Sequence, residues 1–258
     1  MAQWLDAEIP QPRQVFPVSR RYQLSVGREA EHYRIDFGDG TSQTASSPEG
    51  AGRLCLGRLH DLALAALADY TKVHAGDARW GQSRLLVVGP GRSGKTTLMT
   101  RLLYEGFAVH GDEMVLLRDG TAVSYPRRFG IRQPTLALVP QVNRLAPEWA
   151  REPNTHGYQV FALDPRQAGF AWRIEPGPAD VIAYLEPGHG QRSALRPCPQ
   201  HAMAQRLMAQ STPPAGGRSQ WIADVCAILV PARCFILRLG ELASAVSALQ
   251  EVLARETQ

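Results

Sequence analysis

Lysine is scarce in this sequence. Of its 28 basic residues only Lys72 and Lys95 are lysines, and all the others are arginines. Wherever a positive charge alone is needed, this chain uses arginine. A lysine in a functional motif therefore indicates a side chain selected for its own chemistry.

The sequence is also poor in cysteine and contains no CxxC pair. This excludes a disulfide framework and a zinc knuckle and predicts reduced, mostly buried thiols at all four cysteines. They are Cys55, Cys198, Cys226 and Cys234.

Long apolar runs and targeting features are missing as well. No apolar run approaches the ~18 residues that a membrane span requires. Residues 1–14 carry an acidic pair and two prolines where a signal peptide would have a cationic end and an apolar block. The arginines lie singly or in pairs, so the net charge of +4 does not indicate nucleic-acid binding. We expect a cytoplasmic protein without a membrane or nucleic-acid partner.

The first part of the chain has the pattern of a small β element. Residues 20–26 and 33–37 alternate apolar and polar side chains, as half-buried strands do. A tight turn at 38–40 and a linker at 46–52 follow, and then an amphipathic helix over 58–70. With a length of 258 residues, this predicts an N-terminal β-rich element over 1–57 and an α/β core over 58–258.

The core begins with a strand, a loop, a helix and a second strand. Residues 84–88 form a continuous apolar run, typical of a strand buried on both faces. A glycine-rich loop, a helix ending near Gly106 and a strand at 107–110 come next, followed by strands at 114–118 and 121–126 joined by Asp119 and Gly120. The first four elements form the unit that places two parallel strands in one sheet.

The chain after Pro126 gives weaker signals. Repeated prolines predict loops with short strands, and 171–176 and 180–187 are expected to form a strand pair. A helix over 199–210, a flexible join over 213–217, strands at 226–231 and 233–239, and a closing amphipathic helix over 241–256 complete the prediction.

The glycine-rich loop carries the most specific motif of the chain. It satisfies G-x-x-x-x-G-K-[ST] between an apolar strand and a helix, which is the context that the motif requires. Its glycines let backbone N–H groups surround phosphate oxygens, and its lysine reaches the β- and γ-phosphates. We therefore expect it to bind ATP with Mg²⁺, the threonine hydroxyl at position 96 contributing to the metal site. The expected nucleotide-binding residues are Gly89, Pro90, Gly91, Arg92, Ser93, Gly94, Lys95, Thr96 and Thr97.

Two acidic residues and one histidine are candidates for the rest of the site. Asp112 and Glu113 follow the first strand after the loop's helix, where strand ends of a parallel sheet gather ligand groups. A solvated turn is the alternative for this pair. His74 precedes the loop strand, and a structural or exposed histidine is the alternative there.

These residues together resemble the HPr kinase/phosphorylase superfamily, and more closely its shorter HPr-kinase-like relatives, some of which occur with lasso-peptide biosynthesis genes. The resemblance covers roughly residues 70–130: a histidine before the loop strand, the glycine-rich loop, and a DE pair after the next strand. It implies a core like that of phosphoenolpyruvate carboxykinase. The implied activity is transfer of the ATP γ-phosphoryl group to a hydroxyl, typically of serine.

The resemblance also implies roles for single residues. Asp112 would be the base and lie beside magnesium, and Glu113 would be a second carboxylate on the metal side. His74 would contact phosphate or orient Asp112, and Lys95 would stabilise the transferring group. The metal residues would thus be Thr96, Asp112 and Glu113. Such kinases often assemble through their cores, so a homo-oligomer is expected from the same resemblance.

Two alternative functions, and the role of one pair of arginines, stay open. Arg127 and Arg128 are considered as a clamp for the γ-phosphoryl group or an acidic acceptor, against ordinary surface arginines. Instead of a kinase acting on a peptide, protein or small-molecule hydroxyl, the chain could be a nucleotide-dependent binding or regulatory module. It could also be another nucleotide-using transferase. The sequence does not name the acceptor.

Overall fold

The computed structural model describes residues 22–145, 160–188 and 190–254. The described chain divides into two compact units, one ending at Asp69 and the other starting at Tyr70. The division expected after residue 57 falls inside a helix, which belongs whole to the N-terminal unit. Throughout the described ranges, no helix is both long enough and apolar enough to cross a membrane.

The N-terminal unit contains an antiparallel three-stranded sheet. Its strands are β1 (Ser25–Glu29), β2 (His32–Asp36) and β3 (Ser42–Ala45), with β2 in the middle. Gly38 has a φ of 71°, and a Cβ there would lie 2.5 Å from the carbonyl oxygen of Gln23. The turn between β2 and β3 therefore requires glycine, as the sequence predicted. The expected strand residues 20 and 21 lie outside the described ranges.

Helix α2 (Pro48–Ala66) corrects two sequence predictions, the linker at 46–52 and the helix start at 58. Ser47 caps the helix by accepting a hydrogen bond from the N–H of Gly50 at 3.0 Å, and Pro48 occupies the first turn. Serine followed by proline is a helix-start signal, and the small residues after it concealed the helix. Ala51 and Cys55 of α2 pack with Ile35 of β2 in a small core.

The C-terminal unit is built on a mixed six-stranded sheet in the order β13-β15-β12-β6-β5-β7. Strand β6 is parallel to β12, which is parallel to β15, whereas β5 is antiparallel to both β6 and β7. The expected parallel relation between β6 and β7 is therefore present, but β5 lies between them. The strands are β5 (Ala75–Trp80), β6 (Ser83–Val88), β7 (Ala108–Gly111), β12 (Val181–Pro187), β13 (Ala194–Pro197) and β15 (Arg233–Leu239).

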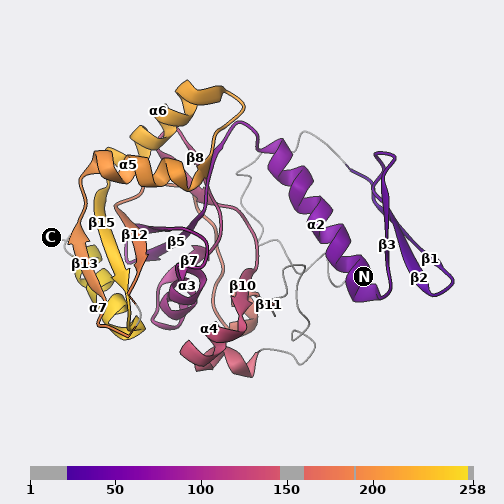
Figure 1. Ribbon diagram of the computed structural model, residues 1–258, viewed down its shortest axis with the longest axis horizontal. Coiled ribbons are helices and arrows are strands. Elements are labelled where there is room, and N and C mark those ends of the chain that lie inside the picture. The colour runs from indigo at the N-terminus through magenta and orange to yellow at the C-terminus, as the bar shows by residue number, and fades with distance from the viewer. Residues whose placement is uncertain (1–21, 146–159, 189, 255–258) are drawn as a thin grey trace. The chain divides into compact units, whose positions relative to one another are not determined.

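Helices cover both faces of this sheet (Figure 1). On one face, Leu85 and Val87 of β6 pack with α3 (Lys95–Tyr104) and α7 (Leu242–Ala254). On the other face, Leu86 and Val88 pack with α5 (Gln200–Ala209) and α6 (Gly217–Leu229). Every residue of β6 is buried, which confirms the doubly covered strand that its apolar run predicted.

Smaller elements surround the sheet. A four-stranded sheet has the order β14-β4-β8-β9, and β10 pairs with β11. The hairpin between β8 and β9 turns through Asp119 and Gly120, both with positive φ, which confirms the turn predicted there. The remaining bounds are β4 (Thr71–Val73), β8 (Val115–Arg118), β9 (Thr121–Ser124), β10 (Phe129–Arg132), β11 (Val160–Leu163), β14 (Ser211–Thr212), α4 (Gln133–Leu138), η1 (Pro140–Arg144) and η3 (Pro165–Ala168).

Two strand predictions in the later chain are wrong. Residues 171–176 form no strand, and residues 226–229 belong to α6. Periodicity alone does not distinguish a short apolar run in a buried helix from one in a strand. All four cysteines are free; Cys226 is exposed, and Cys55, Cys198 and Cys234 are buried.

Candidate functional site

The candidate residues gather at one edge of the six-stranded sheet. Because β6 and β7 are both antiparallel to β5, they end at the same edge, where β12 and β15 also end. The loop Gly89–Thr97 leaves β6 there, Asp112 and Glu113 follow β7, and His74 directly precedes β5. Carboxyl ends of parallel strands are the usual place for ligand groups in an α/β sheet.

Close packing fixes the backbone of the glycine-rich loop. A Cβ on Gly89 would lie 2.9 Å from Ser93 Oγ and 3.0 Å from Leu185 Cβ. Gly94 has a φ of 96°, and a Cβ there would lie 2.7 Å from Leu239 Cδ2. Arg92 also has a positive φ of 66°. Alternation of right- and left-handed residues turns successive N–H groups toward a common point, which is the geometry of an anion-binding nest.

The start of α3 adds donors to this loop. Gly94 precedes the helix and provides no side-chain cap, so the first N–H groups have no hydrogen-bonding side chain from that position. The first turn of any helix leaves such donors without intrahelical acceptors and carries a partial positive charge. The loop and helix together can hold an anion, and phosphate is the ligand for which this arrangement is best suited.

The side chain of Lys95 folds back onto the start of the glycine-rich loop. Its Nζ donates to the carbonyl oxygens of Gly89 at 2.7 Å and Pro90 at 2.9 Å. An ammonium group has three donors, so a third stays available for a phosphate oxygen. Burial lowers the pKa of Lys95 to about 8, while Asp112 and Glu113 oppose this effect. Lys95 is therefore close enough to both acidic residues for their charges to affect its pKa.

The two threonines at the start of α3 have different surroundings. The Thr96 side chain lowers the pKa of Asp112, the acidic residue expected beside the metal. The Thr97 hydroxyl lies 2.8 Å from that of Thr135 in α4. Thr96 therefore contributes its side chain to the site, whereas that of Thr97 joins two helices.

Asp112 is a buried carboxylic acid at the end of β7. Burial, together with the negative charge of Glu113, raises its pKa to about 7, although Thr96 and Arg127 act in the opposite direction. Its Oδ1 is buried and has no hydrogen-bond partner among the described residues. A carboxyl group with a pKa near neutrality can take up a proton at physiological pH, which is the requirement for a general base.

Glu113 points to a different partner. Its Oε2 lies 2.8 Å from Arg127 Nη1, and both side chains are about half exposed. The neighbouring Arg128 is instead 4.0 Å from Asp164, a buried residue that Arg166 also contacts. Of the two arginines considered as a clamp, Arg127 therefore pairs with a candidate site residue, and Arg128 lies near Asp164, which follows β11.

His74 lies at the same edge. Its backbone N–H donates to the carbonyl of Gln210 at 2.8 Å, and its side chain is half-buried. Burial lowers its pKa, the positive charge of Lys95 lowers it further, and Glu113 opposes both. The imidazole is therefore neutral at neutral pH and can accept or donate a hydrogen bond beside the loop.

A magnesium ion fits the residues around Asp112. The carboxylate has a buried oxygen without a described partner, and the Thr96 hydroxyl adjoins it. Magnesium commonly uses one or two protein oxygens and takes its other ligands from phosphates and water. In the ranges that the structure describes, no group of three or more His, Cys, Asp or Glu side chains forms a self-sufficient metal centre. An ion that arrives with a nucleotide matches this donor set best.

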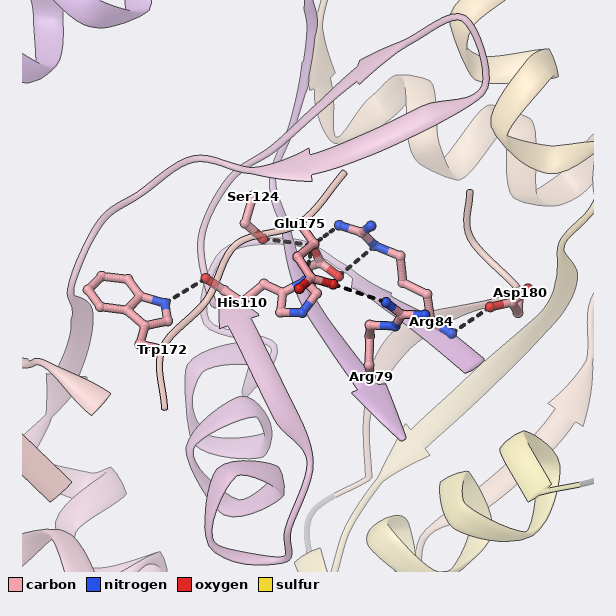
Figure 2. Close-up of polar contacts among 8 residues, drawn as sticks. Arg79, Arg84, His110, Ser124, Trp172, Glu175 and Asp180 are labelled. Carbon is pink, nitrogen blue, oxygen red and sulfur yellow. Dashed lines mark hydrogen bonds and ion pairs between the residues drawn. The ribbon is translucent and has the colours of Figure 1, made fainter. Parts of the chain in front are cut away.

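A buried polar cluster lies in the sheet behind the site, and sequence reasoning missed it. It consists of Asp77 on β5, Arg84 on β6, Ser124 on β9 and His110 on β7. Arg84 donates through Nε to Asp77 Oδ1 at 3.0 Å and through Nη2 to Oδ2 at 2.6 Å. Figure 2 shows Arg84, Ser124 and His110 approaching one another from their strands. The sequence offered no local signal for this cluster, because its members meet only when β5 lies between β6 and β7 and β9 of the four-stranded sheet lies against them.

Comparison with known protein families and with curated proteins found no match for this chain.

Proposed function

We propose that this protein is an ATP- and magnesium-dependent kinase of the HPr-kinase-like type, which transfers the γ-phosphoryl group to a hydroxyl. The observation that carries the proposal is the position of Asp112. A buried carboxyl group with a pKa of about 7 shares one site with Lys95 and the N-terminus of α3. An anion-binding loop alone would support nucleotide binding, and the adjacent base favours transfer.

The loop would hold the phosphates of ATP. Backbone N–H groups of Gly89–Thr97 and the start of α3 would bind phosphate oxygens, and Lys95 would contact the terminal phosphates. A magnesium ion bound with the nucleotide, held by Thr96 with Asp112 beside it, would neutralise charge on the β- and γ-phosphates. Most of the rate enhancement would come from this positioning and charge neutralisation.

Asp112 would then accept the proton of the acceptor hydroxyl. The hydroxyl oxygen forms a bond to the γ-phosphorus, the bond from that phosphorus to the β,γ-bridging oxygen breaks, and ADP leaves. The proton passes to the Asp112 carboxylate. A base with a pKa near the working pH combines a useful ionised fraction with adequate proton affinity. Arg127, which is half exposed beside Glu113, is placed to meet an acceptor or a phosphoryl oxygen.

The test uses γ-labelled Mg-ATP and a cell lysate that has been heated to inactivate its own enzymes. The protein should form ADP and transfer label to a lysate component, which mass spectrometry then identifies. Asp112→Asn should keep Mg-ATP affinity within about tenfold and reduce transfer at least about 100-fold, since positioned base catalysis contributes roughly 10²–10⁴-fold. Lys95→Met should weaken Mg-ATP binding itself.

Other outcomes identify the alternatives. Tight Mg-ATP binding without transfer of label, or with slow hydrolysis alone, would indicate the nucleotide-dependent binding module. Release of pyrophosphate in place of ADP would indicate a nucleotidyl transferase. Transfer by Asp112→Asn at the parent rate would show that the assigned base is wrong.

A further inference from the structure

Strand β7 contains a bulge just before the candidate base. Asp77 of β5 pairs with Gly111, and the next residue, Ala78, pairs with Val109. His110 is therefore the extra residue of β7, without an opposite partner on β5. A bulge of this kind bends its strand and changes the direction of the side chains that follow. Asp112 lies two residues beyond His110, so its direction depends on the bulge.

Both sides of the bulged residue have buried contacts. The imidazole Nδ1 of His110 lies 3.3 Å from Asp77 Oδ2, and its carbonyl oxygen accepts a 2.9 Å hydrogen bond from Trp172 Nε1. Figure 2 shows this bond between Trp172 and His110. Gly111 is enclosed as well, because a Cβ there would lie 3.1 Å from both Cβ and Oγ of Ser124. The backbone leading to Asp112 is thus confined between two strands and an indole.

Asp77 is the centre of these contacts. Its carboxylate accepts two hydrogen bonds from Arg84 and one from Ser124 Oγ at 2.8 Å, and it is fully buried. A carboxylate fixed by two donors of Arg84 on β6 and one of Ser124 on β9 cannot follow a movement of β7, so it holds the bulge in one register.

We propose that Asp77 is a positioning residue, which holds the bulge at His110 and thereby aims Asp112 at Thr96 and Lys95. The inference rests on the proposed function of Asp112 as the base. Asp77 does not touch the reacting groups; it acts through β7. The competing explanation is that Asp77 only stabilises the fold.

A matched pair of variants separates these explanations. Asp77→Asn keeps the side-chain shape and removes the charge that binds Arg84 and lies 3.3 Å from His110 Nδ1. Asp180→Asn makes the same change at another aspartate that contacts Arg84 of β6. Asp180 Oδ2 accepts a hydrogen bond from the backbone N–H of Arg84 at 2.6 Å. That contact lies at the start of β6, at the end away from the loop.

The measurement is ADP formation from Mg-ATP with the heated lysate, at fixed lysate and varied ATP. Asp77→Asn should lower the maximal rate at least about tenfold and change KM for ATP less than about threefold. Asp180→Asn should leave both values within about threefold of the parent. A purely structural role would make the two variants alike, in proportion to their loss of folded protein.

A second variant covers the case in which Asp77→Asn does not fold. Trp172→Phe keeps an aromatic ring against Phe129, whose ring centroid lies 6.3 Å away, but removes the N–H that binds His110. It should lower the maximal rate about three- to tenfold at unchanged KM, and amide hydrogen exchange of residues 107–113 should become faster. The Asp180→Asn variant should show neither effect.

The outcomes distinguish failure of the proposed kinase function from failure of the positioning role of Asp77. If the parent protein forms no ADP, the proposed function fails and this inference fails with it. If the parent is active while Asp77→Asn and Trp172→Phe behave like Asp180→Asn, the inference alone is wrong.

Discussion

Two buried aspartates on neighbouring strands have opposite surroundings. Asp77 in β5 is fully buried and contacts Arg84, Ser124 and His110. Burial alone would raise its pKa, but Arg84 and His110 outweigh that effect and hold the pKa below its ordinary value. Asp112, after β7, is almost as deeply buried, has an oxygen without a described partner, and has a pKa raised to about 7.

The difference shows how one residue type serves two purposes in one sheet. A paired carboxylate in the interior is permanently ionised and holds strands together. A buried carboxylate without sufficient partners stays close to neutral and exchanges its proton near physiological pH. Burial is common to both residues, so the partners decide which carboxyl group is held ionised and which has a pKa near neutrality.

Breaking the interior pair should have the largest effect on stability. Asp77→Leu leaves the buried Arg84 guanidinium without its main counter-ion, and loss of one partner of a buried pair costs about 3–5 kcal/mol. The double variant Asp77→Leu/Arg84→Met should recover at least half of that loss, because no buried charge remains. Urea unfolding measures both. A single variant that loses less than about 1 kcal/mol would show that the pair does not hold the sheet.

Neutralising Asp112 should raise the free energy of unfolding, whereas breaking the Asp77–Arg84 pair lowers it. The pKa of Asp112 is about 7 in the folded protein and about 3.8 in an unfolded chain. The folded state therefore disfavours the ionised form, and the unfolding free energy of the parent should fall as pH rises from about 4 to about 7. In magnesium-free buffer, Asp112→Asn should be more stable than the parent by about 1–3 kcal/mol at pH 8.

The same two proteins should be equally stable at about pH 3, below both pKa values, where Asp112 is largely protonated in the folded and the unfolded state. Equal stability at pH 8 would mean that Asp112 is an ordinary solvated acid, contrary to its assignment as the base. Measuring unfolding at both values keeps the effect of charge separate from the effect of the substitution itself.

Sequence reasoning predicted those residues of the candidate site that lie in local motifs. The loop Gly89–Thr97 follows from the spacing of glycines, lysine and threonine, and Asp112 and Glu113 follow from their place after a strand. His74 was a candidate from its position before the loop strand, the family resemblance gave it a role, and the structure places it at the same edge. These signals are readable because each depends on a strand, a turn or a helix start close by in sequence.

Local sequence patterns did not predict the cluster around Asp77, the start of α2 or the end of α6. Asp77 on β5 meets His110 on β7 and Ser124 on β9 of the neighbouring four-stranded sheet, and no local pattern reveals this tertiary arrangement. The helix start at Ser47–Pro48 was hidden by glycines, and the end of α6 by an apolar run that suits a strand equally well. Tertiary packing decided the cluster and the end of α6, whereas the start of α2 carried a local capping signal that its small residues concealed.

The two threonines of the loop offer a smaller test of which groups belong to the site. Thr97→Val removes the 2.8 Å contact with Thr135 and should cost about 1 kcal/mol of unfolding free energy. Its Mg-ATP affinity, measured by calorimetry, should stay within about twofold of the parent. Thr96→Val is the matched control and should weaken Mg-ATP binding at least about tenfold. Equal losses of affinity would contradict the assignment of Thr96 alone to the metal.

The ion pair at the rim of the site should contribute least. Arg127 and Glu113 are 2.8 Å apart, as close as many buried pairs, but their side chains are 51% and 43% exposed. Water and salt screen such a pair, so Arg127→Gln should change the unfolding free energy by about 0.5 kcal/mol or less, and less still at 1 M salt. A loss above about 1.5 kcal/mol would mean that this pair fastens the segment after β9 to the end of β7. The pairing distance would then matter more than burial, and the contrast between the interior and the rim would lose its physical basis.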